Sequence, residues 1–357
     1  MTKFHAHHTQ KRLELRSLGV LILLFFLISC SATSSGPKPD WVDHQSKKYP
    51  ENRYLLGVGS GDDEQSAEMN ALSAIARIFQ VAVKQSQTEI SNSLTTKTGD
   101  DTQSQWEVQF NEVTELSTQK TLEGAQIVES WVDPAQTVHK LAVLDRLKTA
   151  LILEERIEEL DKAVNRDVNT IRRSGDKLQV ARSYYRSIQM MMKRDVYNSD
   201  LRIVNPTGQG NEFKVSLNST SSDLRTFLAQ ELNMAIEITG PNSEKVKTAL
   251  VESLTKSGFS VLGQTSNNPP NIIIKGELQF KNLDMPSSNK FVRWQADFHL
   301  VNQIDGKEFG SLQRRGREAH VSYEAAEQRA LRLLIKQVNQ KLSQEIFAFV
   351  FGSEKVN

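Results

Sequence analysis

The sequence contains a single cysteine, few aromatic residues and no excess of charge of either sign. Of its 357 residues one is cysteine, and phenylalanine, tryptophan and tyrosine together make up 7%. One thiol excludes a disulfide framework, a cysteine zinc cluster and an iron–sulfur site, because each needs several thiols. Lysine and arginine number 44 against 43 aspartate and glutamate residues, a formal net charge of +1. This balance gives no electrostatic reason to expect a nucleic-acid partner.

Length and composition indicate a globular protein of about two domains. Hydrophobic residues make up 38% of the chain and charged residues 24%, which is typical of folded soluble domains. The sequence contains no nucleophile elbow, no HExxH zinc motif, and no kinase or hydrolase motif. We therefore expect no enzymatic activity and no cofactor.

The first thirty residues have the pattern of an export signal. Lys11, Arg12 and Arg16 form a basic region, and an apolar run of 11 residues follows from Leu18 to Ile28. A membrane-spanning helix needs about 20 apolar residues, so this run fits the core of a signal peptide and not a membrane anchor. Three of the seven histidines, at positions 5, 7 and 8, lie in this leader and would leave with it.

The apolar run ends in Leu27, Ile28, Ser29 and Cys30, which resembles the lipobox of bacterial lipoproteins. The resemblance implies cleavage before Cys30, a diacylglyceryl group on its sulfur and an acyl chain on its new amino group. Several acyl chains anchor a protein stably to a bilayer, whereas one chain binds only marginally. The alternative is an ordinary signal peptide with a chance cysteine. Cys30 is the only cysteine, so a periplasmic domain would carry no free thiol to be oxidised.

Further expectations follow from cleavage at Cys30. Ser31 stands where an aspartate would favour retention at the inner membrane under the sorting rule of diderm bacteria, so the resemblance implies the outer membrane. The mature chain would keep 40 basic and 42 acidic residues, a net charge of −2. We expect the membrane, through the N-terminal lipid, and envelope proteins as partners; the oligomeric state stays open.

The sequence predicts an α+β fold with an ordered series of segments. They are a signal peptide (1–29), a small polar tether (30–39), an α/β sandwich domain (40–148), a helical hairpin (149–196), a two-layer α/β domain (197–351) and a tail (352–357).

In the first domain, Tyr54–Gly61 is typical of a strand, and Asp62 or Asp63 can cap the helix that follows. Strands are expected next, in the Gln-, Ser- and Thr-rich stretch 81–94 and where apolar residues alternate from Trp106 to Val113. Gly99–Asp101 suits a loop tip. Two further strands are expected at 127–132 and 138–144, joined by a turn at Asp133 and Pro134.

From Asp145 onward the spacing of apolar residues changes to the period that is typical of helices. Apolar residues recur at three- and four-residue steps on both sides of Gly175, which predicts two antiparallel helices. Met190, Met191 and Met192 would fill the seam between them. The seam packs within one chain or forms a coiled-coil interface with another.

In the last domain the pattern predicts strands at 201–204, 212–217, 234–239, 259–262, 272–280, 291–301 and 308–317. Helices are expected at 223–233, from Ser243 to Gly258, and at the C-terminal end, where six apolar residues share one face. These six are Leu331, Ile335, Val338, Leu342, Ile346 and Phe349.

Gly57, Gly59 and Gly61 follow a strand and precede a helix, as in nucleotide-binding loops. The dinucleotide fingerprint spacing and the lysine and serine of a phosphate-binding loop are missing, which favours a structural turn.

Asp297 and His299 lie on one face of a predicted strand, together with Arg293 and Gln295. Such a pair could begin a metal or catalytic site, but the sequence assigns neither a third ligand nor a nucleophile, so a solvated or partner-facing surface is favoured.

A short basic cluster of Arg314, Arg315 and Arg317 could contact anionic lipid, lipopolysaccharide or peptidoglycan carboxylates, or be a solvated hairpin surface. His139 and Lys140 begin another strand, where an edge or solvent role suffices.

Several motifs together resemble the Lpp-twenty lipoprotein family. They are Pro39–Val42, the strand Tyr54–Gly61, the alanine-spaced helix Ala67–Arg77, and the later strands in Glu123–Asp133 and Leu141–Leu144. The resemblance covers about 40–148 and implies an outer-membrane or surface lipoprotein with no catalytic residues. The domain arrangement is more weakly similar to that of the periplasmic flagellar T-ring protein, from which this chain departs in its lipobox and its long hairpin.

These observations predict a non-enzymatic outer-membrane lipoprotein that projects into the periplasm as an adaptor or assembly factor. The alternative is a subunit of an envelope machine, such as a flagellar or secretion ring. A third hypothesis, a periplasmic enzyme, depends on Asp297 and His299 alone.

Overall fold

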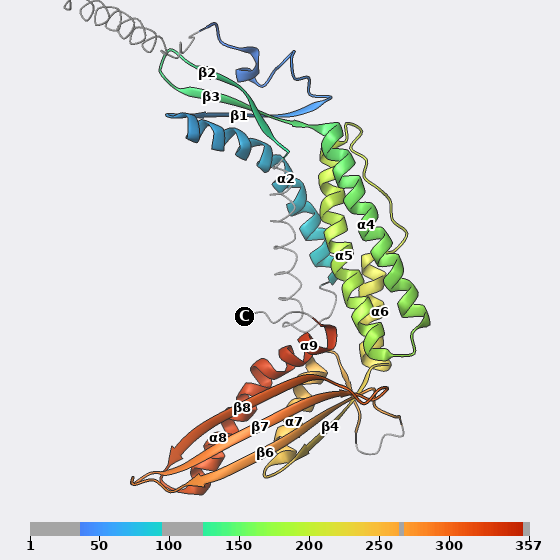
Figure 1. The fold of residues 1–357 in the computed structure, drawn as a ribbon, viewed down its shortest axis with the longest axis vertical. Helices are drawn as coiled ribbons and strands as arrows, with labels where there is room; N and C mark the ends of the chain where they lie inside the picture. Colours follow the sequence, from blue (N-terminus) through green and yellow to red (C-terminus); the bar gives the residue numbers. More distant parts are fainter. Residues whose placement is uncertain (1–35, 95–123, 264–267, 353–357) are drawn as a thin grey trace, which may run out of the picture. The chain divides into compact units, whose positions relative to one another are not determined.

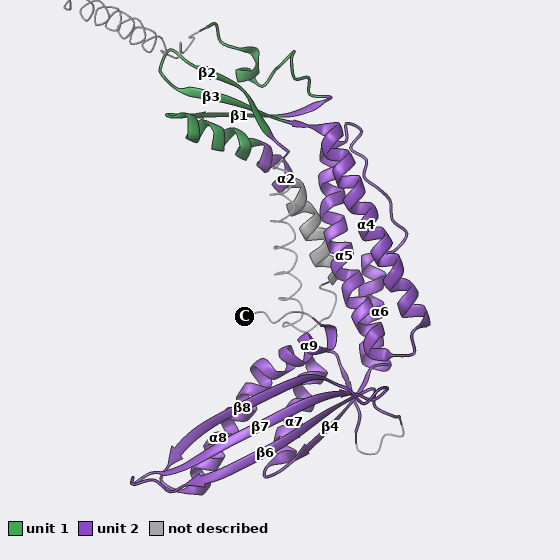
Figure 2. Cartoon of the chain, viewed as in Figure 1, with its two compact units in different colours: residues 1–51, 56–74, 126–143 green, residues 52–55, 75–125, 144–357 purple. Residues whose placement is uncertain are grey.

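The structure is a computed structural model, and it describes residues 36–94, 124–263 and 268–352. It contains helices and two β-sheets, so the predicted α+β class is confirmed (Figure 1). The chain divides into two compact units (Figure 2). The first comprises residues 1–51, 56–74 and 126–143, and the second comprises 52–55, 75–125 and 144–357. The cysteine and the lipobox residues before it lie outside the described residues, and the predicted domain boundaries stay predictions.

A three-stranded sheet in the order β1-β3-β2 forms the centre of the first unit. Its strands are β1 (Tyr54–Gly61), β2 (Gln126–Val132) and β3 (Val138–Asp145), and β2 pairs antiparallel with β3. A short 3-10 helix, η1 (Asp40–Asp43), precedes β1 and buries Trp41. The turn between β2 and β3 is the predicted one: Oδ1 of Asp133 accepts from the backbone N–H groups of Ala135 at 2.9 Å and Thr137 at 2.8 Å.

Helix α2 (Glu64–Leu94) begins where the sequence predicts, because Asp63 caps it. Oδ1 of Asp63 accepts from the backbone N–H of Ser66 at 2.7 Å, which satisfies one of the free donors of the first turn. The strand expected at 81–94 is wrong, since this stretch continues α2. The sequence has no glycine or proline between Asp62 and Leu94 to end the helix. The strand expected at 106–113 and the loop tip at 99–101 lie outside the described residues.

The predicted helical hairpin is present in the second unit as α4 (Arg146–Arg173) and α5 (Lys177–Val204). The side chains of Asp145 and Asp176 cap the two helices by accepting backbone N–H groups of their first turns. Met191 and Met192 are 2% and 1% exposed and belong to the main hydrophobic cluster, as predicted for the seam, and Met190 packs against it partly buried. Two ion pairs join the helices, between Arg186 and Asp167 at 2.6 Å and between Arg194 and Asp161 at 2.7 Å.

The sequence between 197 and 217 folds differently from the prediction. Leu201–Val204 is the last turn of α5 and not a strand; its Leu201 and Val204 are fully buried and the helix ends before Pro206. Residues 212–217 form no strand either. This segment runs along α5, where Asn198 accepts the backbone N–H of Asn211 at 2.7 Å. The next helix, α6 (Leu217–Gln230), begins six residues before the predicted one because Ser216 caps it.

A five-stranded sheet in the order β5-β4-β6-β7-β8 completes the second unit. Its strands are β4 (Asn233–Thr239), β5 (Ser260–Val261), β6 (Ile272–Leu283), β7 (Lys290–Asn302) and β8 (Glu308–His320). Strand β4 is parallel to β5 and β6, whereas β6, β7 and β8 are antiparallel. Each of these strands occurs where the sequence predicts one.

Helices α7 (Ser243–Lys256) and α8 (Tyr323–Gln337) cover one face of this sheet (Figure 1). The predicted C-terminal helix is interrupted by one π-helical turn, η2 (Val338–Leu342), and continues as α9 (Ser343–Phe351). Four of its six predicted apolar residues are buried, and Ile335 and Phe349 are partly buried against the same cluster.

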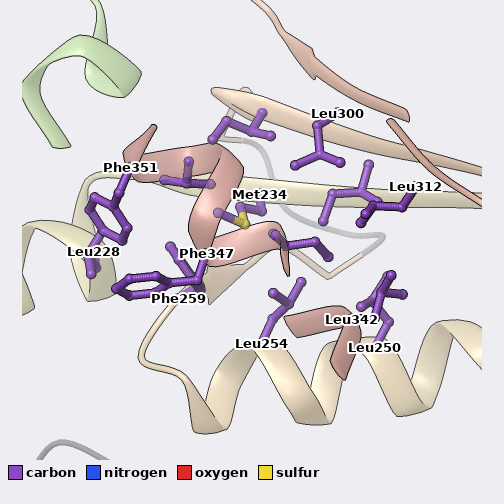
Figure 3. Close-up of a cluster of buried hydrophobic side chains, with 14 of the residues drawn as sticks. Leu228, Met234, Leu250, Leu254, Phe259, Leu300, Leu312, Leu342, Phe347 and Phe351 are labelled. Carbon is purple, nitrogen blue, oxygen red and sulfur yellow. The ribbon is translucent and has the colours of Figure 1, made fainter. Parts of the chain in front are cut away.

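The core of the second unit lies between this sheet and its helices (Figure 3). Phe347 and Phe351 of α9 contact Phe259 and, from the hairpin, Tyr185, whose ring stacks on Phe351 with 4.6 Å between centroids. The hairpin and the sheet therefore share one hydrophobic core, with the seam of the hairpin packed within the chain.

Candidate functional site

The candidate site is the face of the five-stranded sheet that lies opposite α7 and α8. Along β7, residues from Val292 to Leu300 alternate between buried and partly or fully exposed side chains. The buried set contacts the helices, and the other set forms the open face. This alternation confirms the prediction that Arg293, Gln295, Asp297 and His299 share one face.

Asp297 and His299 have separate partners on this face. The carboxylate of Asp297 accepts from Nε2 of Gln295 at 2.7 Å and from Nε2 of Gln313 at 2.8 Å. Nδ1 of His299 lies 2.9 Å from Oε1 of Glu308, and both side chains are nearly half exposed. Within the described residues, no three histidine, cysteine, aspartate or glutamate side chains are grouped to hold a metal ion.

The arginine cluster of β8 divides between the two faces of the sheet. Arg314 points to the helix side, where it pairs with Glu345 of α9. Arg315 and Arg317 are exposed on the open face. The three arginines therefore do not form one surface.

A different basic group exists on the open face, and its members are too far apart in the sequence to be recognised there as a group. Arg293 of β7 lies in register with Lys281 of β6 on one side and with Arg317 of β8 on the other. All three side chains are exposed. The strand register brings together three residues whose ends are 36 positions apart in the sequence. Only the lengths of the two hairpins could have indicated this neighbourhood from the sequence.

The glycines at 57, 59 and 61 lie within strand β1, so the predicted structural turn is wrong and their role is in packing. A Cβ atom on Gly59 would lie 2.1 Å from the backbone nitrogen of Ala71, and one on Gly61 would lie 2.7 Å from that of Ala67. Ala67 and Ala71 are fully buried, so glycine in the strand and alanine in α2 allow the two backbones to approach closely. This explains the motif without a nucleotide.

His139 and Lys140 make local contacts in the first unit. Nζ of Lys140 lies 2.9 Å from Oε2 of Glu64, although Lys140 itself is buried. Nε2 of His139 lies 3.3 Å from Oδ2 of Asp133, and its ring is 5.2 Å from that of Trp131. The pKa of Asp133 is lowered, mainly because its carboxylate accepts the backbone N–H of Thr137 and further because of His139.

The described residues contain no helix that is both long and apolar enough to cross a membrane. Leu27, Ile28, Ser29 and Cys30 are not among these residues. Attachment of lipid at Cys30 therefore stays a prediction from the sequence.

One protein-family model matches part of this sequence. The family model described as LPP20 lipoprotein matches residues 39–145, which confirms the predicted resemblance over about 40–148. The match supports a lipoprotein of the cell envelope. No curated protein matches the sequence.

Solved structures show only distant likeness. A secreted protein from Helicobacter pylori is 11% identical, with 81% of this chain and 98% of that chain covered and a TM-score of 0.37. A minor lipoprotein from Acinetobacter baumannii is 14% identical, with 33% and 93% covered and a TM-score of 0.26. A lipoprotein from Neisseria meningitidis is 11% identical, with 30% and 99% covered and a TM-score of 0.21.

Proposed function

We propose that the chain is a lipid-anchored outer-membrane lipoprotein that projects into the periplasm and acts there as an adaptor or assembly factor. The observation that carries this proposal is the LPP20 lipoprotein match, which begins at residue 39, nine residues after Cys30. A short polar tether between a lipidated cysteine and the first folded residue is the arrangement expected of an anchored domain.

A binding role is favoured over catalysis by the partners of the two candidate catalytic side chains. Asp297 is held by two glutamine amides and His299 by Glu308, so neither activates the other. The acid–histidine pair that does form, His299 with Glu308, is nearly half exposed, and among the described residues no hydrogen bond joins His299 to a serine or cysteine nucleophile.

The anchor is tested by metabolic labelling with an alkyne analogue of palmitate, followed by membrane fractionation. We expect wild type and Ser31→Ala to be labelled and to fractionate with the outer membrane. Cys30→Ala should lose the label and leave that fraction. An unlabelled wild type, or a Cys30→Ala protein that still fractionates with the outer membrane, would contradict the anchor.

The destination is tested separately with Ser31→Asp. This variant should keep the label and move to the inner membrane, because it places an aspartate directly after the lipidated cysteine. A labelled Ser31→Asp protein that stays in the outer-membrane fraction would contradict the proposed sorting.

The adaptor role is tested by in-cell crosslinking and mass spectrometry on wild type and Cys30→Ala. An adaptor should give several substoichiometric partners that depend on the anchor. One recurring partner set in fixed stoichiometry would favour the subunit of an envelope machine instead. Outer-membrane protein without any reproducible partner would contradict both.

A further inference from the structure

On the open face of the five-stranded sheet, residues of β6, β7 and β8 that are in register form rows across the three strands. Two of these rows lie near the β6–β7 hairpin. The row next to the hairpin is apolar and consists of Leu283, Phe291 and Ala319 in register on β6, β7 and β8. The next row on the same face is cationic: Lys281, Arg293 and Arg317. These rows are about 7 Å apart, two residues along each strand.

The cationic row has no counter-ion in the structure. Among the described residues, no carboxylate forms an ion pair with Lys281, Arg293, Arg317 or the neighbouring Arg315. Like charges directly opposite each other on adjacent strands destabilise a sheet. The nearest carboxylates of the same face on these strands, Glu277 and Asp297, lie four residues further along, about 13 Å away and beyond the screening length at physiological salt.

The surrounding charges do not cancel this excess. Lys290 at the start of β7 is exposed, and its Nζ lies 5.5 Å from the centroid of the Tyr323 ring. The exposed carboxylates at this end are Asp284 of the hairpin loop and Glu324 of the first turn of α8. Glu318, on the helix side of β8, is already paired with Arg329 at 2.9 Å.

Exposed apolar side chains extend beyond the apolar row at the same end. Met285, in the β6–β7 loop, is 38% exposed, and Val321, between β8 and α8, is 76% exposed. The hydroxyl of Tyr323 donates to the carbonyl oxygen of Leu283 at 3.3 Å, which joins the segment after β8 to the end of β6. Both exposed apolar residues therefore lie at the end of the sheet that carries the cations.

We propose that this end of the sheet, comprising the β6–β7 loop, Val321 and the cationic row, docks on a membrane surface that contains anionic lipids. Lipid phosphates would neutralise the cations, and the interface would take up Met285 and Val321. A glycan would satisfy the charges but leave the apolar side chains exposed, and an acidic protein as the partner would leave wild type unbound to both kinds of vesicle in the test below. The choice of a membrane rests on the proposed function, since a lipid anchor would hold the protein at a bilayer.

Vesicle co-sedimentation tests this proposal on the chain 31–357, which keeps every described helix and strand and lacks the leader and the lipid. The probes are vesicles of phosphatidylcholine alone and vesicles with one part phosphatidylglycerol to two parts phosphatidylcholine. We expect binding to the anionic vesicles only, weakened by added salt. Arg293→Gln with Arg317→Gln should reduce the partition coefficient about 25-fold, at about 5-fold per lost charge.

Two further double variants separate the contribution of charge to vesicle binding from the contribution of apolar insertion. Met285→Ser with Val321→Ser leaves every charge in place and should weaken binding at high salt more than at low salt. Arg172→Gln with Arg173→Gln removes the same charge from exposed residues in the last turn of α4 and should bind like wild type. Circular dichroism melts of each variant check that the fold is retained.

The proposal is overturned if wild type binds neither vesicle, if it binds phosphatidylcholine equally well, or if the α4 variant loses as much binding as the sheet variant. Loss of binding in the charge variant without any effect of the Met285 and Val321 variant also overturns it, and would indicate electrostatic attraction to anionic surfaces in general without insertion of this end of the sheet. Because the tested chain carries no acyl group, failure here is distinguishable from failure of Cys30 to be labelled.

Discussion

Arg182 of α5 caps the end of α9 by hydrogen bonding to Val350. Its Nε lies 2.9 Å from the carbonyl oxygen of Val350, and its Nη2 lies 3.0 Å from that of Phe349. The last carbonyls of a helix have no partner within the helix, so the Arg182 guanidinium satisfies two acceptors here. Its positive charge also interacts favourably with the negative end of the helix dipole. Burial lowers the pKa of Arg182, and the negative charge of Asp176 opposes that shift. The contact joins the helical hairpin to the helix that packs in the sheet core.

Arg182→Ala should lower the free energy of unfolding by about 2 kcal/mol, because it removes two hydrogen bonds from a charged donor. Arg182→Lys should recover only part of this loss, since an ammonium group cannot form the same fork. Urea unfolding followed by circular dichroism measures both. Arg172→Ala, an exposed arginine at the end of α4, is the control and should change stability by less than about 0.5 kcal/mol. Equal effects of Arg182→Ala and Arg172→Ala would contradict the capping role.

Gly59→Ala should disrupt the first unit. A Cβ atom at this position would lie 2.1 Å from the nitrogen of Ala71 and 2.4 Å from the oxygen of Ala67, both backbone atoms of α2. Neither can move without displacing the helix, so a destabilisation of at least about 2 kcal/mol is expected. Gly175→Ala is the matched control, because nothing lies within 4 Å of a Cβ there. The measurement is the soluble yield and urea midpoint of both variants; a stable Gly59→Ala protein would refute the close approach.

The sequence allowed most elements to be predicted because their signals are local. Asp63 before an alanine-spaced helix, Gly175 between two apolar repeats, and alternation along Phe291–Val301 each occupy one short stretch. The errors occur where tertiary contacts outweigh local preference. Leu201–Val204 has apolar and β-branched residues typical of a strand, yet Arg146 donates to the carbonyl of Ile203 at 2.6 Å and the turn stays helical. The Asn205–Pro206 pair is the local signal in the sequence that a helix ends here, because the residue before a proline disfavours the helical conformation.

The candidate surface could be predicted only in part, for a related reason. Alternation along one strand showed that Arg293 shares a face with Asp297. It could not show that Lys281 and Arg317 stand on either side of Arg293, since register between strands depends on hairpin geometry. The three arginines of β8 are close in sequence, but successive side chains of a strand point to opposite faces. Arg314 therefore pairs with Glu345 on the helix side, and Arg315 and Arg317 lie on the open face.

Truncation of the three consecutive methionines of α5 should have graded effects. Met191→Ala and Met192→Ala should each cost about 2–5 kcal/mol, because both side chains are fully buried in the core. Met190→Ala should cost less, since Met190 is only partly buried. Urea unfolding of the three variants under one condition gives the comparison, with Met190→Ala as the internal control. A larger loss for Met190→Ala would show that the seam faces the other side of α5, as an interface with a second chain would require.

Asp297→Ala combined with His299→Ala should leave localisation, crosslinked partners and envelope phenotype unchanged. The two side chains have separate partners, and their removal should change stability by only about 1 kcal/mol. Gln279→Ala with Ser311→Ala, exposed on the same face, is the matched control for a nonspecific effect of the surface. If the double variant keeps its thermal midpoint but loses the phenotype while the control does not, a catalytic role for this pair becomes the better explanation.

The cap at Asp63 should make the stability of the first unit depend on acid pH. The pKa of Asp63 is lowered from its ordinary value of 3.8, mainly because its carboxylate accepts the backbone N–H of Ser66 and also its hydroxyl. A carboxyl group with a lower pKa in the folded state stabilises the protein fully above its unfolded pKa, and this contribution disappears as the pH falls through the folded pKa.

Thermal unfolding of wild type, Asp63→Ala and Asp63→Asn at a series of pH values checks this dependence. Asp63→Ala should be less stable than wild type at neutral pH, and the difference should shrink below pH 3.8 as the wild-type carboxylate is protonated. Asp63→Asn keeps a capping oxygen that does not titrate, so its stability at neutral pH should exceed that of Asp63→Ala and change less with acid. A difference between wild type and Asp63→Ala that stays constant through the acid range would mean that the cap does not depend on the charge of Asp63.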